Sequence, residues 1–342
     1  MARVAVVTGG TAGIGLATAH LFASRGWAVA VIARDAGRLR ATQAALAPYG
    51  PPVLTISADV SDVEAVDAAA ARIEAELGPI RAWVNNAMST VVSPADRITP
   101  AEYRRVTETT YLSQVYGTLA ALRYMKPRNR GAILQVSSGL GFRAAALQAP
   151  YCAAKFAVSG FTDSLRCELI HDRSDVSLSV IYLPAVNTPQ YRWTRNRSGR
   201  DQNAPDPVYD SRLCAEAIVY AAEHPRREVW VGHSTVMMAA AQALVPGFAD
   251  RKAAEMWPKQ MTDEDLPYRA GNLDAPVPGE VGIDGRFGDR TKRTRTAFWT
   301  SRERDLLMAG FAGIALVGLA SAASLKTGQP SKPMFPASVQ IR

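Results

Sequence analysis

Short apolar runs recur along the first 245 residues, and turn or polar residues bound each of them. Runs of this kind, rich in valine, isoleucine and alanine, are typical of strands buried on both faces of a sheet. The pattern predicts strands at Val4–Thr8, Ala28–Ala33, Val53–Ser57, Ala82–Asn85, Ala132–Val136, Val176–Tyr182 and Glu228–Val231.

Between these runs, apolar positions recur at helical spacing. The predicted helices are Thr18–Arg25, Ala36–Leu46, Val63–Leu77, Ala101–Met125, Tyr151–Ile170 and Ser211–Glu223. Strands that alternate with helices predict a parallel sheet covered on both faces, with right-handed crossover connections. The expected fold class is therefore α/β, a Rossmann-type doubly wound parallel sheet, followed by a C-terminal extension that contains an apolar helix.

The alternation stops after about Val245. Pro246–Trp257 is predicted as one more helix, and Pro258–Asp289 reads as a linker rich in proline, glycine and aspartate. We therefore expect a Rossmann domain over residues 1–245, a helix with a charged linker over 246–303, an apolar helix over 304–326 and a tail over 327–342.

The apolar helix suggests a membrane. Leu306–Leu325 is twenty residues without a charge, and a helix of that length spans about 30 Å of hydrocarbon. Seven basic residues lie between Arg286 and Arg304, which by the positive-inside rule would keep that flank, and the domain before it, in the cytoplasm. Two interpretations stay open: membrane attachment through residues 306–325, or an Ala/Gly-rich helix packed on the protein or on a dimer partner.

Composition excludes several classes of protein. With 48% apolar and 20% charged residues, the chain of 342 residues is globular rather than disordered. The net charge of +8 is diffuse and accompanies no nucleic-acid motif, so we expect no nucleic-acid partner. Three cysteines without a CxxC or Cys/His cluster exclude a disulfide framework and the usual zinc site. Without a secretory signal, the expected location is cytoplasmic.

A glycine-rich segment joins the first predicted strand to the first helix. Gly9, Gly13 and Gly15 let the chain turn tightly and let backbone N–H groups approach a pyrophosphate. The N-terminus of the following helix adds its dipole. This strand–turn–helix context favours dinucleotide binding over an ordinary turn.

The residues after the second strand select the cofactor. An acid there binds the ribose 2′-hydroxyl of NAD, whereas an arginine accommodates the 2′-phosphate of NADP. Ala33 stands at the position of the acid and Arg34 follows it, which favours NADPH. Asp35 keeps NAD open as the alternative, because a shift of one residue would place it on the ribose.

A serine, a tyrosine and a lysine carry the candidate chemistry. Tyr151 and Lys155 are four residues apart and share a helix face, and Ser138 ends a strand. An ammonium near Tyr151 favours the tyrosinate and lowers the tyrosine pKa, which suits proton exchange with an alcohol or carbonyl. Ser138 can orient the substrate oxygen. YxxxK alone is common on helices by chance.

Together these motifs resemble the short-chain dehydrogenase/reductase (SDR) family over about residues 2–235. TGGTAGIG at residues 8–15 matches the family's TGxxxGIG loop, and NNA at residues 85–87 matches its NNA motif. The matched motifs, with Arg34, imply cofactor contacts at Gly9, Thr11, Gly13, Ile14, Gly15, Arg34, Asp59, Val60, Asn86, Ala87, Tyr151, Lys155 and Thr188.

The resemblance implies hydride transfer between NADPH and a carbonyl or alcohol substrate. Tyr151 would be the general acid in reduction, Lys155 would hold the nicotinamide ribose, and Ser138 would position the carbonyl. It also implies a homo-oligomer, with a dimer as the expected state. An SDR epimerase or dehydratase fits less well, because those relatives usually carry TGxxGxxG.

Three positions depart from the family pattern. Met88 replaces the glycine of NNAG, and Leu183-Pro184 stands where the family has Pro-Gly. Thr110 aligns with the catalytic asparagine, which makes it the fourth candidate catalytic residue, although its hydroxyl has a shorter reach. Gln114, one turn further, is the alternative to it. These changes favour a non-catalytic NAD(P)-binding sensor or scaffold at a membrane, whereas the intact Ser-Tyr-Lys set favours an enzyme.

The substrate side is less specific. Pro189–Tyr209 takes the place of the family's substrate loop, where Tyr191 and Trp193 suit an apolar substrate and four arginines suit an anionic one. A plain solvated loop explains it equally well. Leu140, Phe142 and Leu147 favour a mostly apolar pocket.

Overall fold

The computed structural model describes residues 3–279, 282–292, 298–301, 303, 305–306 and 309–310. Contacts group the chain into one unit over Met1–Ser301 and another over Arg302–Arg342. The fold and the candidate site belong to the first unit.

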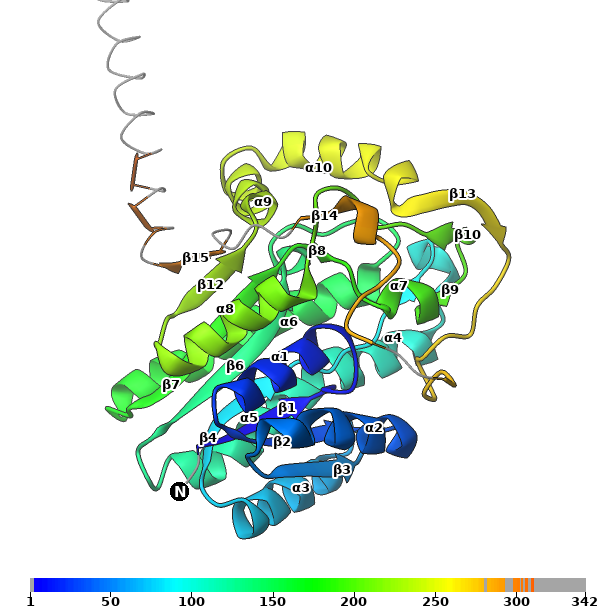
Figure 1. Ribbon diagram of the computed structural model, residues 1–342. Helices are drawn as coiled ribbons and strands as arrows, with labels where there is room; N and C mark the ends of the chain where they lie inside the picture. Colours follow the sequence, from blue (N-terminus) through cyan, green and yellow to red (C-terminus); the bar gives the residue numbers. More distant parts are fainter. Residues whose placement is uncertain are drawn as a thin grey trace, which may run out of the picture. The chain divides into compact units, whose positions relative to one another are not determined.

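An eight-stranded sheet in the order β15-β12-β7-β6-β4-β1-β2-β3 forms the centre of the first unit (Figure 1). The strands β1 to β12 of this sheet run parallel, and β15 is antiparallel to β12. The bounds are β1 Val4–Thr8, β2 Ala28–Ala33, β3 Val53–Ser57, β4 Ile80–Asn85, β6 Gly131–Ser138, β7 Val176–Leu183, β12 Glu228–Val231 and β15 Phe298–Thr300. The mostly parallel α/β fold predicted from the sequence is thus confirmed, and β15 is a strand that the sequence did not predict.

Helices cover both faces of the sheet because its inner strands are apolar on both sides. In β1, Ala5 and Val7 belong to one hydrophobic core and Val4 and Val6 to the other. The first core packs against α1 Gly13–Ser24, α2 Ala36–Leu46 and α8 Ser211–Glu223. The second packs against α3 Val63–Glu76, α5 Ser113–Met125 and α6 Ala149–His171.

The helix predicted over Ala101–Met125 runs without a gap but is not α-helical throughout. It consists of α4 Pro100–Thr107, a π-helical turn at Glu108–Leu112, and α5. A capping box between Thr99 and Glu102 starts α4. Local π-helical turns of this kind often lie at functional sites.

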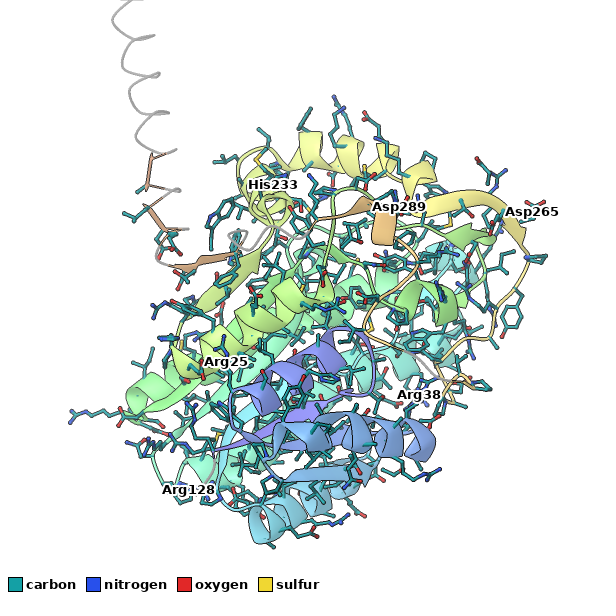
Figure 2. The ribbon with its side chains drawn as sticks, viewed as in Figure 1. Arg25, Arg38, Arg128, His233, Asp265 and Asp289 are labelled. Atoms are coloured by element: carbon teal, nitrogen blue, oxygen red, sulfur yellow. The ribbon has the colours of Figure 1, made fainter. Side chains whose placement is uncertain are left out.

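The residues after β12 pack closely on the loops that follow β7. Two further helices, α9 His233–Leu244 and α10 Pro246–Glu255, lead into β13 Met261–Leu266. The short strands are β5 Val91–Val92, β8 Ala185–Val186, β9 Arg195–Asn196, β10 Gly199–Gln202, β11 Val208–Tyr209 and β14 Thr291–Lys292, and α7 covers Gln190–Trp193. β13 pairs with β10, and β14 pairs with β11. Figure 2 labels Asp265 on β13 and Asp289 near β14.

Two apolar anchors explain why residues 258–292 pack on the fold. Leu273 is fully buried against Val91, Ile98 and Val106, and Phe287 is 5% exposed. The domain boundary expected near residue 245 stays a prediction, but the described part of this segment is bound to the fold along its length.

No helix among the described residues is both long and apolar enough to cross a bilayer. Of the apolar helix predicted over 306–325, only residues 306, 309 and 310 are described, so that prediction lies largely outside the described residues. The described residues give membrane attachment no support.

Candidate active site

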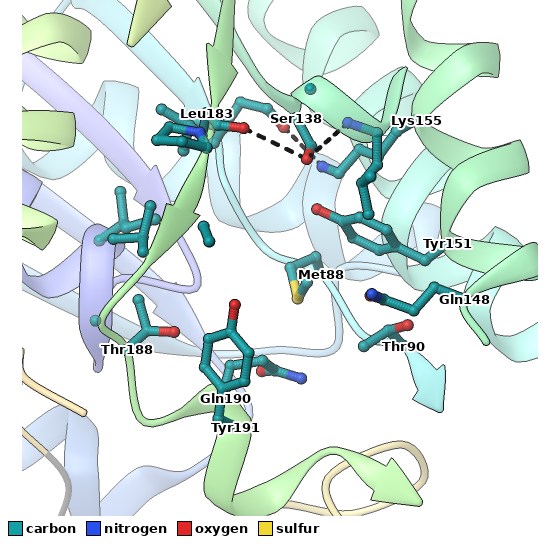
Figure 3. A pocket seen from close by; sticks show the side chains of 18 of the residues that line it. Met88, Thr90, Ser138, Gln148, Tyr151, Lys155, Leu183, Thr188, Gln190 and Tyr191 are labelled. Atoms are coloured by element: carbon teal, nitrogen blue, oxygen red, sulfur yellow. Dashed lines mark hydrogen bonds between the residues drawn. The ribbon is translucent and has the colours of Figure 1, made fainter. Parts of the chain in front are cut away.

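A cavity of about 860 Å³ lies at the carboxyl ends of β1, β2, β4, β6 and β7 (Figure 3). This edge of an open parallel sheet is where α/β proteins bind ligands, because the loops there diverge. Its volume lies in the upper part of the roughly 300–1,000 Å³ range of small-molecule and cofactor sites.

The glycine-rich loop forms one wall of the cavity. Gly9 and Gly13 have φ of +65° and +52°, which favours glycine at both. A Cβ on Gly15 would lie 2.3 Å from the Gly9 carbonyl oxygen. No side chain caps the start of α1, where Ala12 is the N-cap, and its first turn has no acid. The N-terminus of α1 therefore suits an anion such as a pyrophosphate.

Asn86 holds this loop in place. Its Nδ2 donates to the carbonyl oxygens of Thr8 at 3.0 Å and Gly9 at 3.3 Å. The Thr8 hydroxyl oxygen accepts from the backbone N–H groups of Asn86 and Ala87. The predicted cofactor residues Thr11, Ile14, Asp59, Val60, Asn86, Ala87 and Thr188 all line the cavity.

Arg34 also lines the cavity, and its guanidinium already has hydrogen-bond partners. Its guanidinium donates to the carbonyl oxygens of Asn272 at 2.6 Å, Asp274 at 3.1 Å and Leu273 at 3.3 Å. Burial lowers the pKa of Arg34, although Asp59 opposes the shift. The sequence predicted Arg34 but not these partners, which lie about 240 residues further along the chain.

Asp35, the residue that supports NAD as the alternative cofactor, caps a helix. Its carboxylate accepts from the backbone N–H of Arg38 at 2.8 Å, at the start of α2. This N-cap bond engages Oδ1 and gives the carboxylate a role in starting α2.

Ser138, Tyr151 and Lys155 meet on the cavity wall (Figure 3). Ser138 ends β6, and the other two lie on α6. The Lys155 Nζ donates to the Val136 carbonyl oxygen at 2.7 Å and lies 5.5 Å from the centre of the Tyr151 ring. All three are buried, with 8%, 9% and 1% exposed surface respectively. The structure thus brings the three predicted residues together.

Burial shifts the pKa values of Tyr151 and Lys155 in opposite directions. It raises the pKa of Tyr151 well above its ordinary value, and a hydrogen bond with Ser138 only partly offsets this. It lowers the pKa of Lys155 to about 7. The sequence-based expectation of a lowered Tyr151 pKa is therefore wrong for this structure, because desolvation disfavours both the tyrosinate and the ammonium.

Thr110 does not reach the cavity. Its hydroxyl donates to the Ser89 carbonyl oxygen at 2.7 Å and accepts from the Ser89 N–H at 3.0 Å. Gln114 instead shares a hydrogen-bond acceptor with Lys155. Its Nε2 donates at 3.2 Å to the Val136 carbonyl oxygen, which also accepts from the Lys155 Nζ. Its Oε1 is buried and has no hydrogen-bond partner among the described residues.

The substrate side of the cavity only partly matches the expectation. Tyr191 and Trp193 line it, but Phe142 packs against Tyr182 and Trp230 instead. Of the three apolar residues expected there, only Leu140 lines the cavity. Three of the loop's arginines, Arg195, Arg197 and Arg200, form ion pairs with carboxylates.

Two helices that the sequence reasoning did not connect to the site provide much of the apolar wall. These lining residues from α9 and α10 are Met237, Met238, Ala241, Phe248, Ala249, Ala253 and Met256. The signal that was available is the cluster of methionine and alanine directly after the last parallel strand. Among the described residues, no group of His, Cys, Asp and Glu is arranged to hold a metal ion.

The chain is similar to a known protein family and to several of its members. A family model described as short chain dehydrogenase matches residues 3–198. The chain is 33% identical over 279 residues to the uncharacterized oxidoreductase YxnA of Bacillus subtilis (strain 168), covering 79% of this chain and 78% of the relative. It is 29% identical over 231 residues to a fatty acyl-CoA reductase of Acinetobacter baylyi (strain ATCC 33305 / BD413 / ADP1), covering 66% and 75%.

A solved structure of similar fold carries a ligand. It is a metagenomic short-chain oxidoreductase in complex with NADP, with a TM-score of 0.55 and 26% sequence identity. The similarity covers 64% of this chain and 90% of that chain.

Proposed function

Because the chain belongs to the short-chain dehydrogenase family, we propose that it is an oxidoreductase that uses NADP(H) and acts on an apolar carbonyl or alcohol. One observation carries this proposal: Ser138, Tyr151 and Lys155 meet on the wall of a cavity that the glycine-rich loop and Arg34 also line. NAD is the alternative cofactor.

The residues present fit NADP. The start of α1, which no side chain caps, would hold the pyrophosphate, and Arg34 with Arg38 would hold the 2′-phosphate. Both arginines line the cavity, and Asp35, which would favour NAD, caps α2. The solved relative in complex with NADP supports this choice. When bound, the cofactor supplies or accepts the hydride.

Tyr151 would exchange the proton. Its raised pKa keeps the phenol protonated near neutral pH, which is the form that donates a proton to a carbonyl oxygen. The Ser138 hydroxyl would orient that oxygen. Lys155, with a pKa of about 7, can carry or release a proton at Nζ near neutral pH and so would return one to Tyr151.

The apolar wall supports an apolar substrate. Met237, Met238 and Phe248 line the same cavity as the polar catalytic candidates, and methionine adapts to irregular apolar shapes. The relative named a fatty acyl-CoA reductase acts, by its name, on a fatty acyl compound. A cytoplasmic homodimer remains part of the proposal.

The test is reduction of a panel of apolar aldehydes and ketones, followed as NADPH consumption. Tyr151→Phe should lower the rate by about a hundredfold or more, since it removes the general acid, and should leave NADPH binding nearly unchanged. Tyr182→Phe is the matched control, because its buried hydroxyl bonds Ser159 away from the cavity. NADPH binding without turnover by the wild type would favour the non-catalytic sensor or scaffold instead.

A further inference from the structure

A segment near the C-terminus crosses the part of the cavity that holds Arg34. We call residues 268–279 and 282–292 the C-terminal strap. Asn272 and Pro276 of the strap line the cavity itself. Figure 2 labels Arg38 at the place where the strap passes α2.

Carbonyl oxygens of the strap bind the groups that would read phosphate. Arg34 donates to the three carbonyls of residues 272–274. Arg38 donates to the carbonyl of Val277, and at 3.1 Å to that of Gly279. At the start of α1, the Gly13 N–H donates to the Gly282 oxygen at 3.1 Å. Backbone oxygens thus meet three separate donors along the cofactor cleft.

These donors are the ones that the proposed function assigns to the phosphates of NADP. A carbonyl oxygen is a neutral acceptor, whereas a phosphate adds an opposite charge and can accept two parallel hydrogen bonds from one guanidinium. A 2′-phosphate can therefore displace the strap from Arg34 and Arg38. Its net free energy of binding is then smaller than it would be if the two arginines had no other partners. A cofactor without the 2′-phosphate gains nothing from that exchange.

We propose that the C-terminal strap is a built-in competitor for the 2′-phosphate, and that it sets how strongly this site prefers NADPH to NADH. The inference rests on the proposed function, because it requires Arg34 and Arg38 to read the cofactor. The strap therefore lowers the preference of the site for NADPH over NADH.

The strap is anchored away from the groups for which it competes. Leu273 is buried in its own apolar cluster, and its carbonyl also accepts from Arg105 at 3.2 Å. Asp274 pairs with Arg195 at 2.5 Å, and Asp284 pairs with Arg212 at 2.7 Å. Since Arg195 and Arg212 do not line the cavity, these ion pairs can be weakened without changing the cofactor-binding residues.

The experiment breaks both anchoring ion pairs in the full chain from the arginine side, with Arg195→Gln plus Arg212→Gln, because the Asp274 carboxylate also interacts electrostatically with Arg34. Loss of two positive charges would by itself weaken binding of an anionic cofactor, so tighter binding reports release of the strap. Kd for NADPH and NADH is measured by nicotinamide fluorescence. Two partly exposed ion pairs lost from the strap should tighten NADPH binding by about threefold to tenfold, and NADH binding by less. The matched control is Lys126→Gln plus Arg227→Gln, which removes the same charge from two ion pairs distant from the strap.

A second measurement follows the strap directly by hydrogen exchange of the wild type with and without NADPH. The amides of Asn272 and Gly285, which donate to Trp193 and Asn187, should exchange faster with NADPH. Slower exchange, or NADPH binding that the anchor variant leaves unchanged or weakens, would overturn the competition. If neither protein binds NADPH, the proposed function fails as well, and this outcome is distinct from failure of the strap alone.

Discussion

The carbonyl of Val136 receives two hydrogen bonds at the reacting end of the cavity, from Lys155 and from Gln114. We expect Gln114 to help position the lysine through this shared acceptor, and its Oε1 has no hydrogen-bond partner among the described residues. Thr110, which the alignment of motifs favoured, contacts Ser89 instead. Its role as a fourth catalytic residue stays a prediction.

Substitutions at Thr110 and Gln114 distinguish a role in stability from a role in turnover. Thr110→Val leaves the Ser89 N–H and carbonyl without this partner and should lower the free energy of unfolding by about 1–3 kcal/mol. Gln114→Met should cost less stability, because it also removes the unpartnered oxygen, but it should reduce turnover more and shift its pH profile. Urea unfolding and turnover against pH measure both effects. Greater loss of turnover in Thr110→Val would instead return the catalytic role to Thr110.

At the scale of the element, the start of α2 shows how an acidic residue beside the cofactor site can stabilise a helix instead of binding ribose. The Asp35 carboxylate satisfies a backbone N–H that the helix leaves unpaired at its start. Asp62 does the same for α3, bonding the N–H groups of Glu64 and Ala65. The two aspartates are thus equivalent in structure but differ in their distance from the cavity, since only Asp35 lines it.

Asp35→Ala should therefore lower the free energy of unfolding by about 1 kcal/mol, the usual cost of a lost N-cap, and leave Kd for NADH unchanged. Asp62→Ala is the control and should show the same loss of stability. Thermal unfolding and a fluorescence titration measure the two quantities. NADH binding weakened in Asp35→Ala alone would place the carboxylate on the ribose and restore NAD as the preferred cofactor.

At the scale of the whole molecule, one buried lysine makes stability depend on pH. The pKa of Lys155 is about 7 in the folded chain, below its ordinary value of 10.5. Between these values the unfolded chain binds a proton that the folded chain does not. This group therefore makes the free energy of unfolding rise with pH in that window, by at most about 1.4 kcal/mol per pH unit. Below pH 7 both states are protonated and the dependence ends.

Lys155→Met should remove this dependence. The wild type should gain stability relative to the variant between pH 7 and pH 9, a range that ends before the ordinary tyrosine pKa of about 10. Urea unfolding of both proteins at each pH measures the difference. A constant difference across the range would mean that Lys155 stays charged in the folded chain.

Local patterns determined much of this protein. The parallel strands and the glycine-rich turn depend on residues close together in sequence, so their positions could be predicted. The same holds for Ser138, Tyr151 and Lys155, whose motif spacing identified the family that the comparisons confirm. Strand β15 and the π-helical turn within the helix over 101–125 were not predictable, because pairing across the sheet and local π-helical geometry decide them.

Only the tertiary structure decided what surrounds those residues. Arg34 and Asn272 are 238 positions apart, yet they bond in the folded chain. The apolar wall from α9 and α10 and the strap across the cleft likewise join segments distant in sequence. The proton affinities of Tyr151 and Lys155 follow from burial, which no spacing of residues reveals. Sequence alone identified the family and the residues of the candidate site, because both depend on local motifs, whereas long-range packing decided the burial of those residues and the contacts that compete for them.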